Sequence, residues 1–424
     1  MITEKTQTAQ HIIDAIAPAS SKVDFIRDET LVKALQYLEE KGLPGARHEE
    51  YKYCNLEAVL RKEFKHITQE FQSVNDVNQW RNKDAVTLVV LNGIYSEALS
   101  DKVVVRGLQL STLSDMDAEA RKHIATLADV QSDAFIALNT AFCSNGLHLR
   151  VEKNAEIPMP VQVIYLNSCK GQAFVNTRSL IELEEGASLH LIEQHIVIGE
   201  GKVFTNLVSE KRVAANAKLT SCIFQNETAQ AYSINTHQVE VGADATYDNT
   251  TITLGGQVVR NNHQVVLSGK QSVAHLNGLF STNESRLVDN HTLMDHRVPH
   301  CESNELYKGI INGKSTGVFN GKIFVRKDAQ KTNAYQSSKN ILLSDDATIN
   351  TKPQLEIYAN DVKCSHGTST GKIDNNALFY LNARGIGKET AKKMLLSSFA
   401  QEIIQKIESD DLRDTVSTLF ENSI

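Results

Sequence analysis

The 424-residue chain lacks several features that mark common functional classes. Its formal net charge is −7, so it has no excess of basic residues for binding nucleic acid or an anionic membrane. Its six cysteines include no CxxC pair, which argues against a zinc ribbon or a disulfide framework. No apolar run approaches the roughly 18 residues of a membrane span, and the first residues show no basic stretch followed by an apolar core. These absences favour a cytoplasmic protein with reduced thiols.

The distribution of residue types divides the chain into three regions. Residues 1–84 show helical periodicity, for example in the apolar run around Ile12. From 85 to 375 the segments are short, rich in β-branched residues and punctuated by Gly, Asn and Asp, with a helical interlude at 117–143. Residues 376–424 are again helical, with a long apolar stripe. We therefore expect an N-terminal helical domain, a β core and a C-terminal helical domain.

The β core repeats itself. Short alternating strands, each followed by a small or polar turn, recur along it. The turn positions that we take as equivalent are Gly186, Asn216, Asp244, Lys270, Lys314 and Asp346. One interval, from Lys270 to Lys314, is longer than the others and could hold an irregular coil. The remaining step of roughly 30 residues, with strand content, predicts a parallel β-helix, because propeller blades usually need about 40 residues. We expect the terminal helices to cap its open ends.

Two glycine motifs suggest nucleotide or DNA binding, but simpler explanations fit both. Gly309–Thr316 (GIINGKST) resembles a P-loop, yet its glycines are one residue too close and a strand, not a helix, is expected next. A tight turn of the β-helix explains it better. Gly385–Lys388 (GIGK) resembles a DNA-binding hairpin, and a glycine turn that opens a terminal helix accounts for it.

A second candidate region is rich in metal-ligand side chains. It contains His291, His296, His300 and Cys301. A spacing of four residues between two histidines helps a metal site only on a helix, and this segment is of β type. Without three convergent ligands we expect these side chains to meet local carbonyl groups.

Cys364 and His366 are the third candidate. They stand two residues apart in a probable strand, so they should project from the same face. A neutral imidazole can ligate iron, and a thiolate can ligate iron or receive sulfur. Two ligands make half of a metal site, so the other half would come from elsewhere in the chain or from another subunit. A purely structural pair is the alternative.

The residues around this pair resemble a known family. Thr351–Gly367 (TKPQLEIYANDVKCSHG) is similar to the signature of the SufD branch of the SufB/SufD family, in the Suf iron–sulfur cluster assembly system. Further similar segments are Arg47–Tyr53, Tyr307–Ile310, Val318–Gly321, Lys372–Asp374, Phe379–Leu381 and Arg384–Ile386. Tyr51 and Cys54 depart from the family pattern, where Trp and Thr are common. SufB members carry an extra cysteine where this chain has Gln336 to Asn340.

The resemblance implies a right-handed parallel β-helix with helical terminal domains, in a scaffold subunit without catalytic activity. It implies pairing with SufB through the C-terminal end of the β-helix, with a homodimer possible when SufB is absent. It also implies a transient iron–sulfur cluster at the SufB–SufD interface, where His366 contributes a metal ligand and Cys364, beside it, belongs to the same cluster-assembly site. Whether a flavin binds the complex stays open.

The resemblance further implies that the C-terminal helices hold the SufC ATPase, so this chain binds no nucleotide itself. The expected SufC-facing residues are Thr390, Met394, Leu395, Phe399 and Ile403. Two other functions stay open. One is a polysaccharide-active β-helix enzyme, although such enzymes are usually secreted and need clustered carboxylates and basic groups. The other is a structural solenoid adaptor in which His366 is inert.

Overall fold

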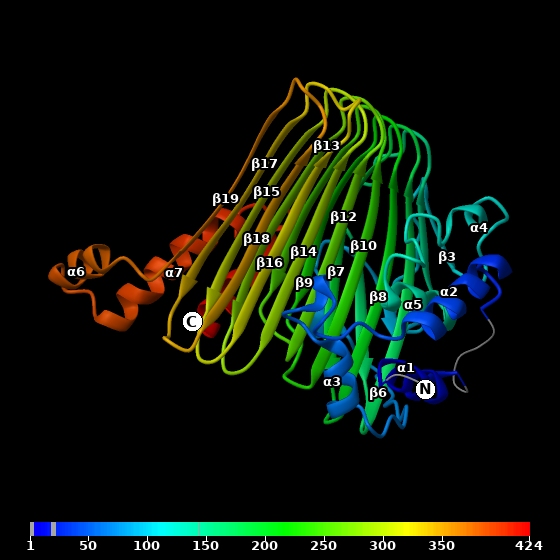
Figure 1. Ribbon diagram of the computed structural model, residues 1–424, viewed down its shortest axis with the longest axis horizontal. Helices are drawn as coiled ribbons and strands as arrows, with labels where there is room; N and C mark the ends of the chain where they lie inside the picture. Colours follow the sequence, from blue (N-terminus) through cyan, green and yellow to red (C-terminus); the bar gives the residue numbers. More distant parts are fainter. Residues whose placement is uncertain (1–3, 18–22, 144) are drawn as a thin grey trace.

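The computed structural model describes residues 4–17, 23–143 and 145–424. It is a parallel β-solenoid of about eight turns, in which successive strands from β4 onward alternate between two facing sheets (Figure 1). The ten-stranded sheet consists of β1 (Val86–Leu91), β2 (Ile94–Tyr95), β5 (Val161–Ser168), β7 (Ser188–Ile198), β9 (Lys218–Gln225), β11 (Thr246–Thr253), β13 (Val273–Thr282), β15 (Glu302–Ile311), β17 (Asn333–Leu342) and β19 (Lys363–Gly371). The nine-stranded sheet consists of β3 (Leu108–Thr112), β4 (Gly146–Val151), β6 (Gln172–Leu183), β8 (Lys202–Val213), β10 (Ala231–Val241), β12 (Val258–Leu267), β14 (Leu287–His296), β16 (Thr316–Val325) and β18 (Thr348–Ile357).

Each coil contributes one strand to each sheet and pairs in parallel with the coils before and after it. Within the parallel stack the pairing keeps a strict register; for example, His237 on β10 is opposite His263 on β12. Because side chains alternate between the faces of a strand, every second residue points into the solenoid. The inward residues include Leu191, Val239 and Phe319, and they form one apolar core that runs through the coils.

The turns show where the sequence-based register was wrong. One edge of the solenoid carries turn residues with positive φ at Gly186, Asn216, Asp244, Gln271, His300 and Lys331. Each lies one coil, roughly 30 residues, after the one before it. Lys314 and Asp346 belong to the opposite edge, in the turns that follow β15 and β17. The longer interval before Lys314 therefore joined two different edges, and it contains three ordinary strands, β13, β14 and β15. The P-loop-like segment is the turn between β15 and β16, with a strand after it as expected.

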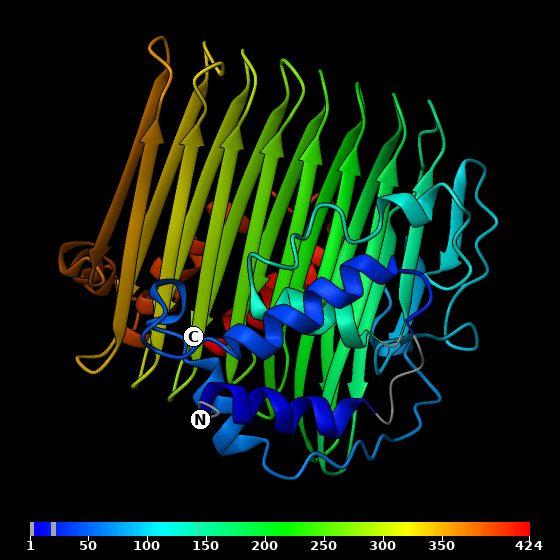
Figure 2. The ribbon, with the colours of Figure 1, turned by 45° about the vertical axis from the view of Figure 1, so that its right-hand side comes forward.

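The terminal helices cover the faces of the sheets and do not cap the ends. Helices α1 (Glu4–Ile16), α2 (Asp28–Lys41), α3 (Leu56–Glu63) and α5 (Ala134–Phe142) pack on the outer face of the nine-stranded sheet, with α4 (Ala120–His123) nearby (Figure 2). Helices α7 (Lys388–Ile404) and α8 (Asp410–Ser423) pack on the outer face of the ten-stranded sheet. Those outer faces carry apolar side chains such as Phe204 and Ile252 that need cover. The expectation of end caps is thus wrong for these helices, because the exposed apolar area lies on the flanks. In the described part of the chain, no helix has the length and apolar character needed to cross a membrane.

The two ends of the solenoid differ. At the N-terminal end Val103, Val105 and Leu108 pack against the interior core and close it. At the C-terminal end the chain leaves β19 and forms α6 (Asn375–Ala383), which projects away from the last coil (Figure 1). The last coil is therefore left open.

Candidate functional site

The open C-terminal end consists of β18 and β19. Within the described ranges, strand β18 pairs only with β16 and β19 only with β17, so each strand has one free edge. No residue of either strand is buried. Free backbone groups on an exposed strand edge are a template for pairing with another chain. This end of the solenoid is thus suited to a partner.

Cys364 and His366 both lie on β19, as their spacing predicted. Cys364 is in register with Ala334 and packs against the interior core, so its side chain faces inward. His366 is two residues further and points to the same face; its position is exposed at the open end. Partial burial raises the pKa of the Cys364 thiol. The other five cysteines are buried, which leaves Cys364 as the most accessible thiol.

A row of polar side chains leads from the interior to His366. Glu305 on β15, Gln336 on β17 and His366 on β19 occupy paired positions on three neighbouring strands. Gln336 Nε2 donates to Glu305 Oε1 at 3.1 Å, and Thr292 Oγ1 donates to Glu305 Oε2 at 2.5 Å. Burial raises the pKa of Glu305 to about 7. Sequence reasoning missed this row, although its members recur at an interval of exactly one coil each.

The predicted SufC-facing residues on α7 divide into two groups. Ile403 is fully buried against the sheet, and Phe399 is half-buried beneath Lys308, whose ammonium lies 4.4 Å from the ring centre. Leu395 is also half-buried, whereas Thr390 and Met394 are exposed. Thr390 and Met394 are therefore the predicted residues most accessible to a partner.

Helix α6 adds apolar side chains that the prediction did not include. Asp374 caps its first turn by accepting from the backbone N–H groups of Asn376 and Ala377. No residue of α6 is buried, and Phe379 and Tyr380 are 74% and 57% exposed. Large apolar side chains this exposed on a projecting helix are typical of a docking surface.

The histidine-rich segment does not form a metal site. His296 points into the solenoid, where its Nε2 lies 2.9 Å from Ser303 Oγ. His291 lies on the outer face, while His300 occupies a turn and Cys301 is buried in the core. Among the described residues, no group of three or more His, Cys, Asp or Glu side chains is arranged to hold a metal ion.

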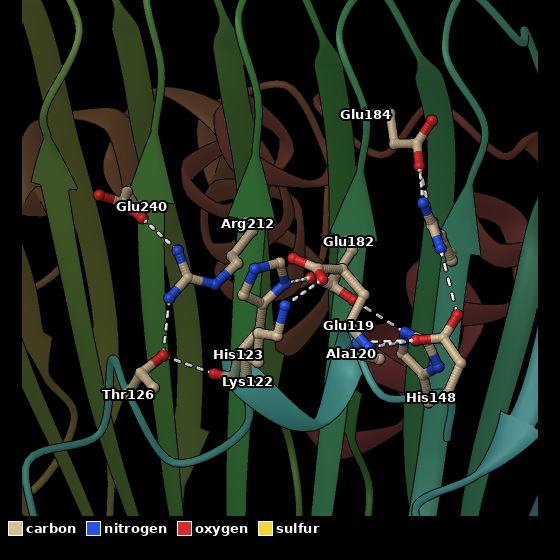
Figure 3. Close-up of polar contacts among 12 residues, drawn as sticks. Glu119, Ala120, Lys122, His123, Thr126, His148, Glu182, Glu184, Arg212 and Glu240 are labelled. Carbon is tan, nitrogen blue, oxygen red and sulfur yellow. Dashed lines mark hydrogen bonds and ion pairs between the residues drawn. The ribbon is translucent and has the colours of Figure 1, made fainter. Parts of the chain in front are cut away.

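A charged cluster lies on the outer face of the nine-stranded sheet beside α4 (Figure 3). The Glu182 carboxylate lies between two imidazoles, 2.5 Å from His123 Nδ1 and 2.9 Å from His148 Nε2. Arg212 donates to Glu240 at 2.6 Å. These charges are matched within the chain, so the cluster braces the segment around α4 against the sheet and needs no ligand.

Comparisons with known proteins show which family the chain resembles. The family model described as the SUF system FeS cluster assembly SufBD core domain matches residues 165–399, and the SufBD N-terminal region model matches residues 13–163. Similar proteins include iron-sulfur cluster assembly protein SufD of Escherichia coli, which is 32% identical over 90% of this chain and 89% of its own length. Another is the chloroplastic protein ABCI7 of Arabidopsis thaliana, 32% identical over 66% of this chain and 61% of its own length. With both models and a near full-length relative matched, the chain belongs to the SufBD family of iron–sulfur cluster assembly proteins.

Proposed function

We propose that this chain is the SufD-type scaffold subunit of a SufB–SufC–SufD complex, in which it supplies one side of a cluster-assembly site. The observation that carries the proposal is the open last coil, which presents His366 and Cys364 beside two free strand edges. A partner solenoid that paired with these edges would bring its own side chains opposite them. Because each subunit would supply only part of the ligands, cluster assembly would depend on formation of the interface.

His366 is the better of the two candidate ligands. Its position at the open end is exposed, so a nascent cluster can reach the imidazole. Cys364 is partly buried and its pKa is raised, so the free chain holds it mainly as the thiol. A partner subunit would therefore supply thiolates while this chain supplies an imidazole. The cluster is cargo in this scheme and leaves with its recipient.

The C-terminal helices give the complex a second contact. Phe379 and Tyr380 on α6, with Met394 on α7, offer an exposed apolar surface for the SufC ATPase. Helix α6 follows β19 after only a few residues, so a partner that moves α6 would pull on the strand that carries His366. ATP hydrolysis by SufC could bias the open and closed states of the interface in this way.

The test is to purify SufB and SufC after coexpression with and without this chain, and to measure iron and acid-labile sulfide per complex. The proposal expects a stable ternary complex and cluster retention that falls severalfold when the chain is left out. Equal cluster content without the chain, or its failure to join the complex, would contradict the scaffold role.

A further inference from the structure

The side chain of Gln336 has an unmet hydrogen-bonding group at the open end. Gln336 is buried, and its Oε1 has no hydrogen-bond partner among the described residues. A buried carbonyl oxygen without a partner loses its hydrogen bonds to water and destabilises the fold. An unsatisfied buried atom needs a specific explanation, and a hydrogen bond that forms only when the open end is covered by a partner would supply one.

The orientation of the Gln336 amide is fixed by hydrogen bonds in the solenoid interior. Its Nε2 donates to Glu305 Oε1 at 3.1 Å, and Glu305 is anchored in turn by Thr292. Gly321 leaves the room that the amide occupies, since a Cβ there would lie 2.4 Å from Gln336 Nε2. With Nε2 committed to Glu305, Oε1 is the atom available to a neighbour.

The neighbour in register is His366. It occupies the position paired with Gln336 on the adjacent strand, on the same face. Adjacent strands lie about 4.8 Å apart, which is within the reach of a glutamine and a histidine side chain. We propose that Gln336 Oε1 accepts a hydrogen bond from one ring N–H of His366 and so positions the imidazole for cluster ligation. Gln336 is a positioning residue, because it acts through His366.

The bond would have two consequences for His366. It fixes which ring nitrogen carries the proton, which leaves the other nitrogen free to face the seam as a ligand. It also makes the ligating nitrogen more basic, as an outer hydrogen-bond acceptor does for metal-bound histidines in general. A more electron-rich ligand stabilises the oxidised cluster and lowers its midpoint potential. The inference rests on the proposed function, since it assumes that His366 meets the cluster.

Two variants of this chain test it in the purified ternary complex. Gln336→Met keeps the size of the side chain but removes both the Oε1 acceptor and the Nε2 donor to Glu305. The exchange Glu305→Gln/Gln336→Glu keeps the bond between positions 305 and 336 and presents a stronger acceptor to His366. We expect Gln336→Met to lower iron and sulfide content severalfold and to raise the midpoint potential of the cluster that remains. We expect the exchange to restore the content and to shift the potential below that of the wild type.

A merely structural role of Gln336 would not move the potential in opposite directions in the two variants. Wild-type content and potential in both variants, or loss of the cluster in both, would overturn the inference. His366→Ala is measured beside them. If His366→Ala itself keeps the wild-type cluster content, the proposed function fails; if only His366→Ala lowers the content, the role of Gln336 fails alone.

Discussion

Gln336 and His366 are paired in register on β17 and β19, on the face that lines the solenoid interior. The first is buried and held by Glu305, and the second is exposed at the open end. A packed interior thus lies directly behind the residue that we propose meets the partner. Precise placement of a ligand by a packed neighbour is what a site shared between two subunits requires.

The free edge of β19 is expected to pair with the partner. The backbone N–H of Lys363 donates to the carbonyl oxygen of Thr332, on the β17 side of the strand. Because backbone N–H groups alternate between the two edges of a strand, the N–H of Ser369 also points to β17, whereas the N–H of Thr368 points to the free edge. Thr368→Pro should leave the fold intact but abolish association with the SufB-type partner in size-exclusion chromatography. Ser369→Pro, the matched control, should lower the thermal stability because it removes a ladder bond. Association of the Thr368→Pro chain at wild-type strength would show that the edge is not used.

On α7, Met394 belongs to the surface that we propose contacts the ATPase partner, whereas Ile403 belongs to the surface that packs on the sheet. Met394 is 47% exposed, whereas Ile403 is fully buried against the sheet. Met394→Glu should weaken binding of the ATPase partner about tenfold or more in calorimetry without a change in Tm. Ile403→Glu should instead lower Tm strongly, because it buries a carboxylate among apolar side chains. Unchanged ATPase binding by Met394→Glu would place the contact elsewhere.

The buried ion pair of Arg178 and Glu210 should contribute strongly to the stability of the fold. Both side chains are inaccessible to solvent, with Arg178 Nη2 2.8 Å from Glu210 Oε1. Burial would raise the pKa of Glu210, but Arg178 and the backbone N–H groups of residues 125–128 hold it below its ordinary value. Arg178→Met should lower the free energy of unfolding by about 3–5 kcal/mol, because it removes the charge that balances the buried Glu210 carboxylate. The double variant Arg178→Met/Glu210→Gln should recover part of this loss in urea titrations; an additive loss would contradict the pairing.

Glu227 should make stability fall as the pH rises. Burial raises the pKa of Glu227 from 4.5 to about 7, so between these values the folded chain binds a proton that the unfolded chain releases. The contribution of Glu227 to the free energy of unfolding therefore decreases as the pH rises through that window. The free energy of unfolding of Glu227→Gln, measured with urea and compared with that of the wild type, should rise by up to about 3 kcal/mol between pH 5 and pH 8. Glu200→Gln, at an exposed position, is the control, and the same pH response in both variants would refute the assignment.

The sequence allowed the solenoid to be predicted because its coil step and strand content are local properties. It did not allow the edges to be told apart, since turns at both edges use Gly, Asn, Asp and Lys; that is why Lys314 and Asp346 were aligned with Gly186. The placement of the helices was also missed. Which apolar stripe meets which face depends on tertiary packing, and Ile403 has the same periodicity whether it contacts its own sheet or a partner.

Only part of the candidate site could be predicted from the sequence, for a related reason. The alternation of Cys364 and His366 is visible within one strand, whereas Gln336 and Glu305 lie one and two coils away from His366. Only a correct register brings them together, and the step is 31 residues from Glu305 to Gln336 but 30 from Gln336 to His366, so a uniform coil step misses by one residue. Closeness along the chain does not imply closeness in space. His291 lies on the outer face, His296 in the interior and His300 in a turn.

The central claim is that His366 contributes to a cluster held between two subunits. The most direct measurement is the iron and sulfide content of the purified ternary complex carrying His366→Ala, beside Ser365→Ala, which alters the adjacent residue on the opposite face of β19. The account predicts an intact complex with severalfold less iron and sulfide for His366→Ala, and wild-type content for Ser365→Ala. Wild-type content in an intact His366→Ala complex would contradict it.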